Sequence, residues 1–474
     1  MHEERGENAA PVGPQAIVRA GLCIGCGSCA AQPAPASHEA RMVLDRYGEL
    51  KPHGAPAWLR EGPAAFARTC PFSPAAADES QLAGALFADA AHADAQVGRW
   101  RAAYVGHVAQ PGFRERGSSG GMVSWTASEL LRTGAVDAVA HVAPDDGERL
   151  FRYRLSRTPE ALAAGAKSRY YPVEMSQVLQ TIHREPGRYA VVGVPCFVKA
   201  VQLLRREDPV MRERIVATLG LFCGHMKSTR LIESFAAQMD VPLDQVRGVD
   251  FRLKDARRPA NWYTAHFALR DGRTVQRDWF HLAEGDWGSG FFQNEACNFC
   301  DDVVSETADI AFGDAWLEPY ASDGRGTNVV IVRSARLHAL LARAIDDGRL
   351  ALSPVDADFV ARTQAAGLRQ RREGLGYRLT WRRATFFPGG RRDGVPPVKR
   401  VRADARIPWQ RKLVYRARAA ISTWSRRLFA LSRAVRAPWL YLGWARAALA
   451  LYHALAYSRG RLGAWFARVA EPRS

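Results

Sequence analysis

The segment Tyr189-Ala-Val-Val-Gly-Val-Pro-Cys196 is the clearest indication of the fold. Its apolar run is typical of a strand buried on both faces, and a helix is predicted to follow at residues 198–205. Residues 215–223 repeat this plan, since an apolar strand again ends in a cysteine. Strands that end in a functional turn and continue into a helix are typical of α/β proteins. We therefore predict an α/β fold with Cys196 and Cys223 at the carboxyl ends of two strands.

The same patterns extend in both directions from this centre. A glycine- and serine-rich turn at residues 117–121 precedes an apolar-periodic helix predicted at 122–131. Residues 249–279 alternate in the manner of an antiparallel insertion. Further strands are predicted around Tyr104 and at 134–142, 308–314 and 326–333.

Eight cysteines divide into two groups of four. The first group combines a C-x2-C-x2-C run with a distant Cys-Pro, which is the arrangement of bacterial ferredoxins. Four thiolates are what one 4Fe-4S cluster requires, so the sequence predicts two such clusters and a role in electron transfer. The first quartet is Cys23, Cys26, Cys29 and Cys70, and the second quartet is Cys196, Cys223, Cys297 and Cys300.

Three other interpretations of the cysteines are open from the residues alone. Disulfides belong to oxidising compartments, and the N-terminus lacks the apolar core of a signal peptide, which favours a cytoplasmic location. Zinc accepts four thiolates, although its usual pattern is two C-x2-C pairs. Isolated cysteines such as Cys196 and Cys223 are also common as unligated core residues.

The positive charge of the chain is concentrated in its last quarter. Residues 369–474 contain 25 Lys and Arg against 4 Asp and Glu, whereas residues 1–368 contain 41 against 44. Such an asymmetry bears on partners and location rather than on the fold. We predict an iron–sulfur module at 1–95, two parts of a central domain at 96–185 and 186–365, and a basic amphipathic helical tail at 366–474.

Taken together and in this order, the motifs resemble those of the coenzyme F420 hydrogenase/dehydrogenase beta-subunit family, which is related to 7-hydroxymethyl chlorophyll a reductase. The resemblance runs from about Gly21 to about Ser334. It rests on the motifs Cys23 to Cys29, Ser118-Ser-Gly-Gly121, Lys167-Ser-Arg-Tyr170, Gly193-Val-Pro-Cys196, Leu221-Phe-Cys-Gly224, Cys297-Asn-Phe-Cys300 and Ala308-Asp-Ile before Gly313-Asp314.

The resemblance implies an α/β flavoprotein with a ferredoxin-like module, in which two 4Fe-4S clusters lie close to FAD. It further implies an oxidoreductase that takes electrons from ferredoxin or a similar donor and reduces an organic substrate, with bacterial surface-polysaccharide synthesis as one setting. A chain of bacterial composition is not expected to use the deazaflavin as its substrate. The alternative is a non-catalytic electron-transfer subunit that docks on a separate enzyme. The FAD would be held by Ser118, Ser119, Gly120, Gly121, Lys167, Ser168 and Tyr170, with His225, Asp309 and Asp314 as candidates for shaping the pocket.

The basic tail interleaves arginine with tryptophan, leucine and tyrosine between residues 406 and 468. Its most apolar window contains Arg446, and a charge near the centre of a bilayer costs about 2.5 kcal/mol or more, which argues against a spanning helix. Basic amphipathic helices with tryptophan anchors are typical of an anionic membrane surface. Docking on a partner protein is the alternative, and no motif indicates nucleic-acid binding. The oligomeric state is not predictable from these patterns.

Overall fold

The computed structural model describes residues 12–33, 35–145, 147, 149–381, 400–460 and 463–464. An eight-stranded mixed sheet organises the molecule, in the order β15-β5-β14-β13-β9-β8-β6-β7. Its four central strands, β6, β8, β9 and β13, are parallel, and the outer strands pair antiparallel. The strands are β5 (Ala102–Val108), β6 (Ala138–Pro144), β7 (Phe151–Ser156), β8 (Tyr189–Gly193), β9 (Ile215–Leu221), β13 (Ile310–Asp314), β14 (Asn328–Val332) and β15 (Leu350–Pro354).

Alternate residues of the central strands enter two different cores. Ala190 and Val192 of β8 pack beneath helices α7 and α13, whereas Tyr189 and Val191 face α9 and α10. This alternation explains the continuous apolar run, because both faces of the sheet are covered. The predicted strands and helices of this region are confirmed. The covering helices are α6 (Phe113–Arg116), α7 (Met122–Arg132), α8 (Pro159–Ala163), α9 (Ser176–Arg184), α10 (Pro195–Glu207), α11 (Pro209–Arg214), α13 (Ala335–Asp346), α14 (Ala357–Thr363) and α15 (Ala365–Arg371), whereas α12 (Arg230–Gln238) packs in a separate core with residues 246–269.

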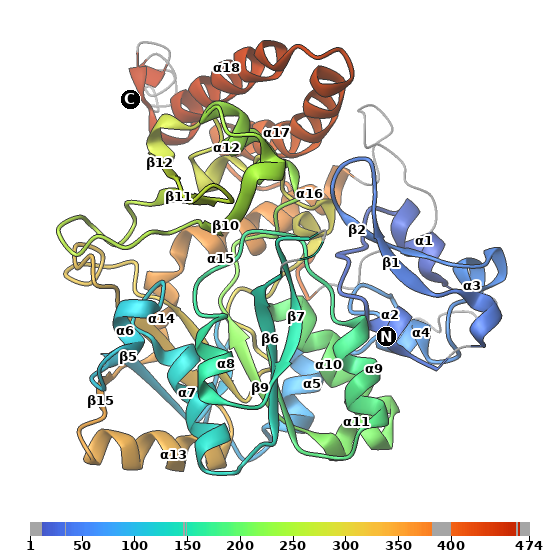
Figure 1. Ribbon diagram of the computed structural model, residues 1–474, viewed down its shortest axis with the longest axis vertical. Helices are drawn as coiled ribbons and strands as arrows, with labels where there is room; N and C mark the ends of the chain where they lie inside the picture. The colour runs from blue at the N-terminus through green and yellow to red at the C-terminus, as the bar shows by residue number, and fades with distance from the viewer. Residues whose placement is uncertain are drawn as a thin grey trace.

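The N-terminal segment lies beside α9 and α10, as Figure 1 shows in blue. Its apolar residues belong to the same core as β8, so this segment is packed onto the sheet rather than tethered to it. It contains α1 (Pro14–Arg19), α2 (Ser28–Ala31), β1 (Arg41–Leu44) paired with β2 (Leu50–His53), α3 (Pro56–Glu61), α4 (Phe66–Thr69), α5 (Glu79–Leu86) and the short pair β3 (His92–Asp94) and β4 (Gly98–Trp100).

The predicted antiparallel insertion is present as a separate three-stranded sheet. It is built from β10 (Val246–Asp250), β11 (Thr264–Leu269) and β12 (Thr274–Asp278), with β11 in the middle. Short 3-10 turns follow it, and one of them, η5 (Glu295–Phe299), carries Cys297. The insertion therefore returns the chain to the main sheet just before β13.

The described part of the basic tail forms helices that pack on the same chain. After α16 (Glu373–Trp381), helices α17 (Trp409–Ala434) and α18 (Pro438–Tyr457) form a hairpin beside β10–β12, at the end of the molecule opposite α13 (Figure 1). One face of α17 is buried, and this face includes serine and arginine side chains as well as apolar ones. Arg426 on this face forms an ion pair of 2.6 Å with Glu49. Within the described residues, no helix is both long and apolar enough to cross a membrane.

Candidate functional site

A cavity of about 1070 Å³ opens at the carboxyl ends of the parallel strands. Gly193 at the end of β8, Leu221 at the end of β9 and Asp314 at the end of β13 all line it. Ligand sites of α/β sheets lie at this edge, because the loops that follow parallel strands converge there. The cavity is large enough for a dinucleotide-sized molecule.

The turn before α7 forms one end of this cavity. Gly117, Ser118, Ser119 and Gly121 line it, while Gly120 faces away. A side chain at Gly120 would lie 2.8 Å from the Gly106 carbonyl oxygen, so its glycine is required by close packing. Gly121 has φ +84° and precedes the first residue of α7, which directs the start of that helix into the cavity. Helix N-termini with small flanking residues suit phosphate groups.

The predicted segment Lys167 to Tyr170 meets this turn. The Ser118 hydroxyl accepts a hydrogen bond of 2.8 Å from the backbone amide of Ser168, which joins the two predicted cofactor motifs. Lys167 has φ +114°, and its ammonium group forms a 3.0 Å ion pair with Asp250. Lys167 therefore lines the cavity as a paired cation.

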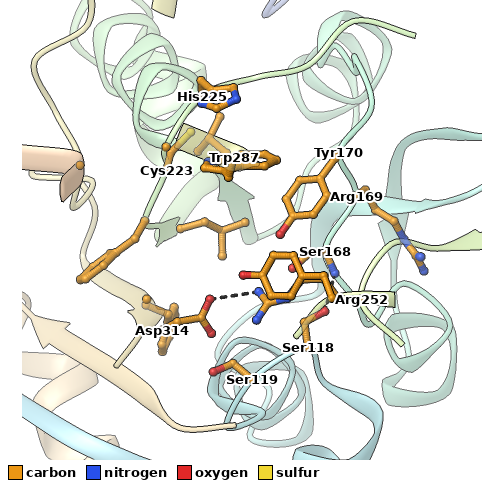
Figure 2. A pocket seen from close by; sticks show the side chains of 18 of the residues that line it. Ser118, Ser119, Ser168, Arg169, Tyr170, Cys223, His225, Arg252, Trp287 and Asp314 are labelled. Carbon is orange, nitrogen blue, oxygen red and sulfur yellow. Dashed lines mark hydrogen bonds and ion pairs between the residues drawn. The ribbon is translucent and has the colours of Figure 1, made fainter. Parts of the chain in front are cut away.

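A buried ion pair that the sequence did not indicate lies between these motifs and the cysteines. Arg252 donates to the Asp314 carboxylate at 3.0 Å and stacks at 4.3 Å from the Tyr263 ring, as Figure 2 shows for the ion pair. Burial opposes the charge of Arg252, but Asp314 raises its pKa above the usual range. The predicted role of Asp314 in shaping the pocket is consistent with this place. Asp309 is tied instead to the amide and hydroxyl of Thr218, at 2.8 and 2.7 Å, and does not line the cavity.

The opposite end of the cavity is formed by His225, Trp287 and residues of the tail. The His225 ring stacks on Trp287 with centroids 4.3 Å apart, and both are visible at the top of Figure 2. Burial, together with nearby cations, lowers the pKa of His225 well below its usual value, so the ring is neutral. Arg418 donates to its Nδ1, which leaves the proton on Nε2, and this atom has no partner among the described residues. His225 thus has an unused hydrogen-bond donor beside the cavity.

Helix α18 completes this end. The Nε2 atom of His453 is 2.8 Å from a carboxylate oxygen of Asp286, and Tyr457 and Arg459 also line the cavity. The tail therefore contributes directly to the site, which the sequence did not indicate. Neither the apolar window around α18 nor the spacing of its histidine pointed to a ligand site.

All four cysteines of the second quartet line one small cavity. Cys196 begins α10, Cys223 follows β9, and Cys297 and Cys300 lie on either side of the end of turn η5. Burial raises the pKa of the Cys297 thiol to about 11 and that of the Cys223 thiol to about 12. These four thiols are available to a group that takes them as thiolates, because metal binding deprotonates its ligands.

The cysteines of the first quartet are also brought together. Burial raises the pKa of the Cys29 and Cys70 thiols, and the nearby Cys23 and Cys26 raise it further. Gly25 and Gly27 both have φ +82°, and a side chain at Gly25 would lie 2.6 Å from the Leu50 carbonyl oxygen. The glycines of the C-x2-C-x2-C run are thus needed for the tight loop.

Among the described residues, no three His, Cys, Asp or Glu side chains converge closely enough to hold a single metal ion. A cubane distributes its four thiolates over four iron atoms, so its ligands are spaced more widely than those of one ion. The all-cysteine donor set and the cavity shared by the second quartet fit a cluster of this kind.

Cys223 connects the two cavities. It lines both the small cavity of the second quartet and the large cavity, as does Met226. On the other side, Ile24 and Phe72, which are neighbours of Cys23 and Cys70, line the small cavity as well. The first quartet, the second quartet and the large cavity therefore lie next to one another in this order.

The floor of the large cavity contains a histidine that makes the protein sensitive to acid. His141 on β6 is buried against the Ser156 hydroxyl at 2.7 Å, and burial lowers its pKa to about 4. In the folded state His141 therefore stays neutral, whereas in the unfolded chain it takes up a proton near pH 6.5. As the pH falls from 6.5 to 4, we expect the free energy of unfolding to decrease by about 3 kcal/mol through His141 alone.

The variant His141→Asn checks this expectation, because asparagine can still bond to Ser156 without titrating. Urea denaturation midpoints of both proteins are measured between pH 7.5 and pH 4.5. The difference between the denaturation midpoints of the native protein and His141→Asn should shrink or reverse toward low pH. Parallel curves at all pH values would show that His141 is protonated equally in both states.

Two family models match the chain, and both describe the beta subunit of coenzyme F420 hydrogenase/dehydrogenase. The model of its N-terminal part matches residues 103–180, and the model of its C-terminal part matches residues 187–358. No curated protein matches. Among solved structures, a chain of the F420-reducing [NiFe] hydrogenase complex from Methanosarcina barkeri, in a study of xenon derivatization, is 17% identical with a TM-score of 0.48. That match covers 65% of this chain and 99% of the other.

Proposed function

The chain belongs to the coenzyme F420 hydrogenase/dehydrogenase beta-subunit family of electron-transfer oxidoreductases, and on this premise we propose that it is an iron–sulfur flavoprotein reductase. In this proposal the first and second quartets each hold a 4Fe-4S cluster, and the large cavity holds FAD and an organic substrate. When bound, FAD supplies an exchange between single electrons and electron pairs. The proposed parts are residues 1–95 for the first cluster, 96–185 and 186–365 for FAD and the second cluster, and 366–474 for the tail.

The observation that carries the proposal is the position of Cys223 and Met226 on both cavities. Electron transfer requires that carriers lie close together in a protected interior. The two quartets and the large cavity meet this condition in series, with Ile24 and Phe72 between the quartets. A structural zinc site would not need a ligand residue that also lines a dinucleotide-sized cavity.

The residues of the cavity fit FAD at both of its ends. The glycine- and serine-lined turn before α7 suits the pyrophosphate, with Ser118 and Ser168 fixed to each other. At the other end, the aromatic rings of Tyr170 and Trp287 lie with centroids 4.7 Å apart, and the Nε2 atom of His225 is free to donate. Such groups can orient a ring system and bind its polar edge.

In this proposal the large cavity also holds the organic substrate, beside the cofactor. His453 and Tyr457 of α18 form part of the cavity wall. This wall favours an enzyme over a subunit that only passes electrons to another protein. The donor in this proposal is ferredoxin or a protein of the same one-electron class, which would approach the first quartet.

Anaerobic purification of the full chain, followed by iron, sulfide and flavin analysis and EPR after dithionite reduction, tests the proposal. We expect about eight iron and eight sulfide atoms per chain, as two cubanes require, and about one flavin. Zinc in place of iron, or a chain that binds no flavin, would refute it.

We also propose that the exposed face of the α17–α18 hairpin binds an anionic membrane surface. Trp424, Leu431 and the C-cap residue Val435 are spaced by seven and four positions and so lie on one side of α17 and its C-terminal end, with exposed fractions of 40, 54 and 53%. Trp439, at the start of α18, is 70% exposed. Arg427 packs on Trp424, which places positive charge among these apolar groups. Such a surface fits lipid headgroups of negative charge.

Replacing Leu431 and Trp439 together by serine should weaken binding to vesicles of mixed phosphatidylglycerol and phosphatidylcholine by tenfold or more, since each buried side chain contributes about 1.5–3 kcal/mol. Cosedimentation with such vesicles is the measurement. Trp262→Ser is the matched control, because Trp262 is an exposed tryptophan (38%) outside the tail. Equal vesicle binding by the native chain, the double variant and Trp262→Ser would contradict the proposal. Binding to neutral vesicles alone would contradict it as well.

A further inference from the structure

Four cations lie buried around the second quartet. Lys227, Arg371, Arg378 and Arg418 are exposed by only 2, 4, 5 and 7%. A buried charge without a counter-charge is strongly unfavourable, so such groups normally face a carboxylate. Within the described part of the chain, however, the hydrogen bonds of these four side chains end on neutral acceptors.

Arg371 is the closest of them to the cysteines. Its guanidinium donates to the carbonyl oxygens of Cys297 at 3.1 Å, Cys300 at 3.3 Å and Cys223 at 3.4 Å, and also to that of Gly224. One planar side chain therefore holds the loops of three of the four cysteines.

The other three cations surround Arg371. Arg378 donates to the carbonyl oxygens of Asn298 at 2.9 Å and Gln370 at 2.7 Å. Arg418 donates to Gln293 at 2.8 Å and to His225, and Lys227 donates to the Phe291 carbonyl oxygen at 2.6 Å. Burial lowers the pKa of Lys227 to about 7, Arg418 lowers it further, and Glu284 and Asp286 oppose the shift.

The first quartet has a different charge environment. Its nearest cation, Lys51, donates to the Cys23 carbonyl oxygen at 2.8 Å but is paired with Glu49 at 2.9 Å. Arg426 also pairs with Glu49, so the positive charge near the first quartet is matched by a carboxylate. Near the second quartet, Asp302 is the carboxyl group that lines the small cavity, and its oxygens accept from the amides of Val304 and Glu306.

We propose that Lys227, Arg371, Arg378 and Arg418 form an electrostatic cage that offsets the negative charge of the cluster held by the second quartet and gives it a higher reduction potential than the cluster of the first quartet. The inference rests on the proposed function. Net charge and hydrogen bonding to the ligands are the protein's means of setting such a potential, and buried cations that hydrogen-bond only to neutral acceptors favour the reduced form. Three of the four cations lie beyond residue 358, where the family match ends, so the cage is built largely by the tail.

The experiment is an anaerobic redox titration of the full-length chain with dithionite and mediators, in which EPR follows the reduced clusters. A Cys29→Ser chain, which retains only the second quartet intact, identifies the signal of that quartet. We expect this cluster to be reduced before the other. In Arg371→Met, which keeps the length of the side chain but removes its charge, the ratio of reduced to oxidised second cluster at a fixed potential should fall by about tenfold or more. The signal of the first cluster should not move.

Two further variants separate charge from geometry. Arg371→Lys keeps the charge and should retain most of the native ratio, even where fewer hydrogen bonds to the loops lower the iron content. Arg378→Met should shift the second cluster in the same direction as Arg371→Met and carries the test if the latter does not fold. The inference would be overturned if the second cluster were reduced only after the first. It would also be overturned if Arg371→Met and Arg371→Lys changed the ratio of reduced to oxidised second cluster equally. Absence of iron from the native chain would instead refute the proposed function.

Discussion

Cys223→Ser should remove one of two clusters and disconnect the large cavity from the electron donor. Serine is a poor ligand for iron, because its hydroxyl is not deprotonated as a thiol is. We expect the iron and sulfide contents to fall to about half, which is about four atoms of each. Since Cys223 lines both cavities, reduction of bound flavin by a ferredoxin-class donor should slow by at least about 100-fold. Stopped-flow absorbance of the flavin measures this rate.

Cys29→Ser is the matched control, since it removes a ligand of the first quartet by the same chemical change. Both variants should lose half of the iron, but each should keep the EPR signal that the other lacks. Flavin content should remain near the native value in both, because neither cysteine belongs to the turn before α7. A Cys223→Ser chain with full iron content and native flavin reduction would show that this cysteine is only a core residue.

The arrangement of the second quartet could be predicted in part, because it follows from short-range patterns. The apolar runs that end at Cys196 and Cys223 indicate parallel strands, and β8 and β9 are indeed neighbours with parallel register. Adjacent parallel strands must place their following turns at the same edge. The approach of Cys297 and Cys300 to this edge depends on where a three-stranded insertion returns the chain, which no local pattern records.

The cage of cations could not be predicted, since its members look like the rest of a basic tail. Arg371 is one of the 25 basic residues between 369 and 474, and nothing in its neighbours distinguishes it. Its function depends on three carbonyl oxygens that lie 71 to 148 positions earlier in the chain. Similarly, the periodicity of α17 shows that the helix has two faces, but the partner of Arg426 is Glu49, 377 positions away. The tail thus covers its own chain with one face and leaves the other exposed.

Gly121→Ala should destabilise the protein and abolish flavin binding. Gly121 has φ +84°, and an added Cβ would lie 2.6 Å from the carbonyl carbon of Phe113, so the backbone must move. The left-handed conformation costs an alanine about 1–2 kcal/mol, and overpacking adds about 1–3 kcal/mol, so we expect the free energy of unfolding to fall by about 3 kcal/mol or more. Asn328 bonds to the first amide of α7 at 3.2 Å and to the Gly313 carbonyl oxygen at 2.9 Å, which would transmit the displacement to β13.

The matched control lies at the other end of the same helix. Gly134 follows α7 with φ +64°, yet an added Cβ would meet no atom within 4 Å. In Gly134→Ala only the conformational penalty of about 1–2 kcal/mol applies, and this variant should retain its flavin. Urea denaturation and flavin absorbance after gel filtration compare the two variants. Equal losses of stability and flavin in both variants would mean that the conformation of the glycine, and not the close approach of α7 to Phe113, controls the site. A flavin-loaded Gly121→Ala chain would show that the turn before α7 is not where the cofactor binds.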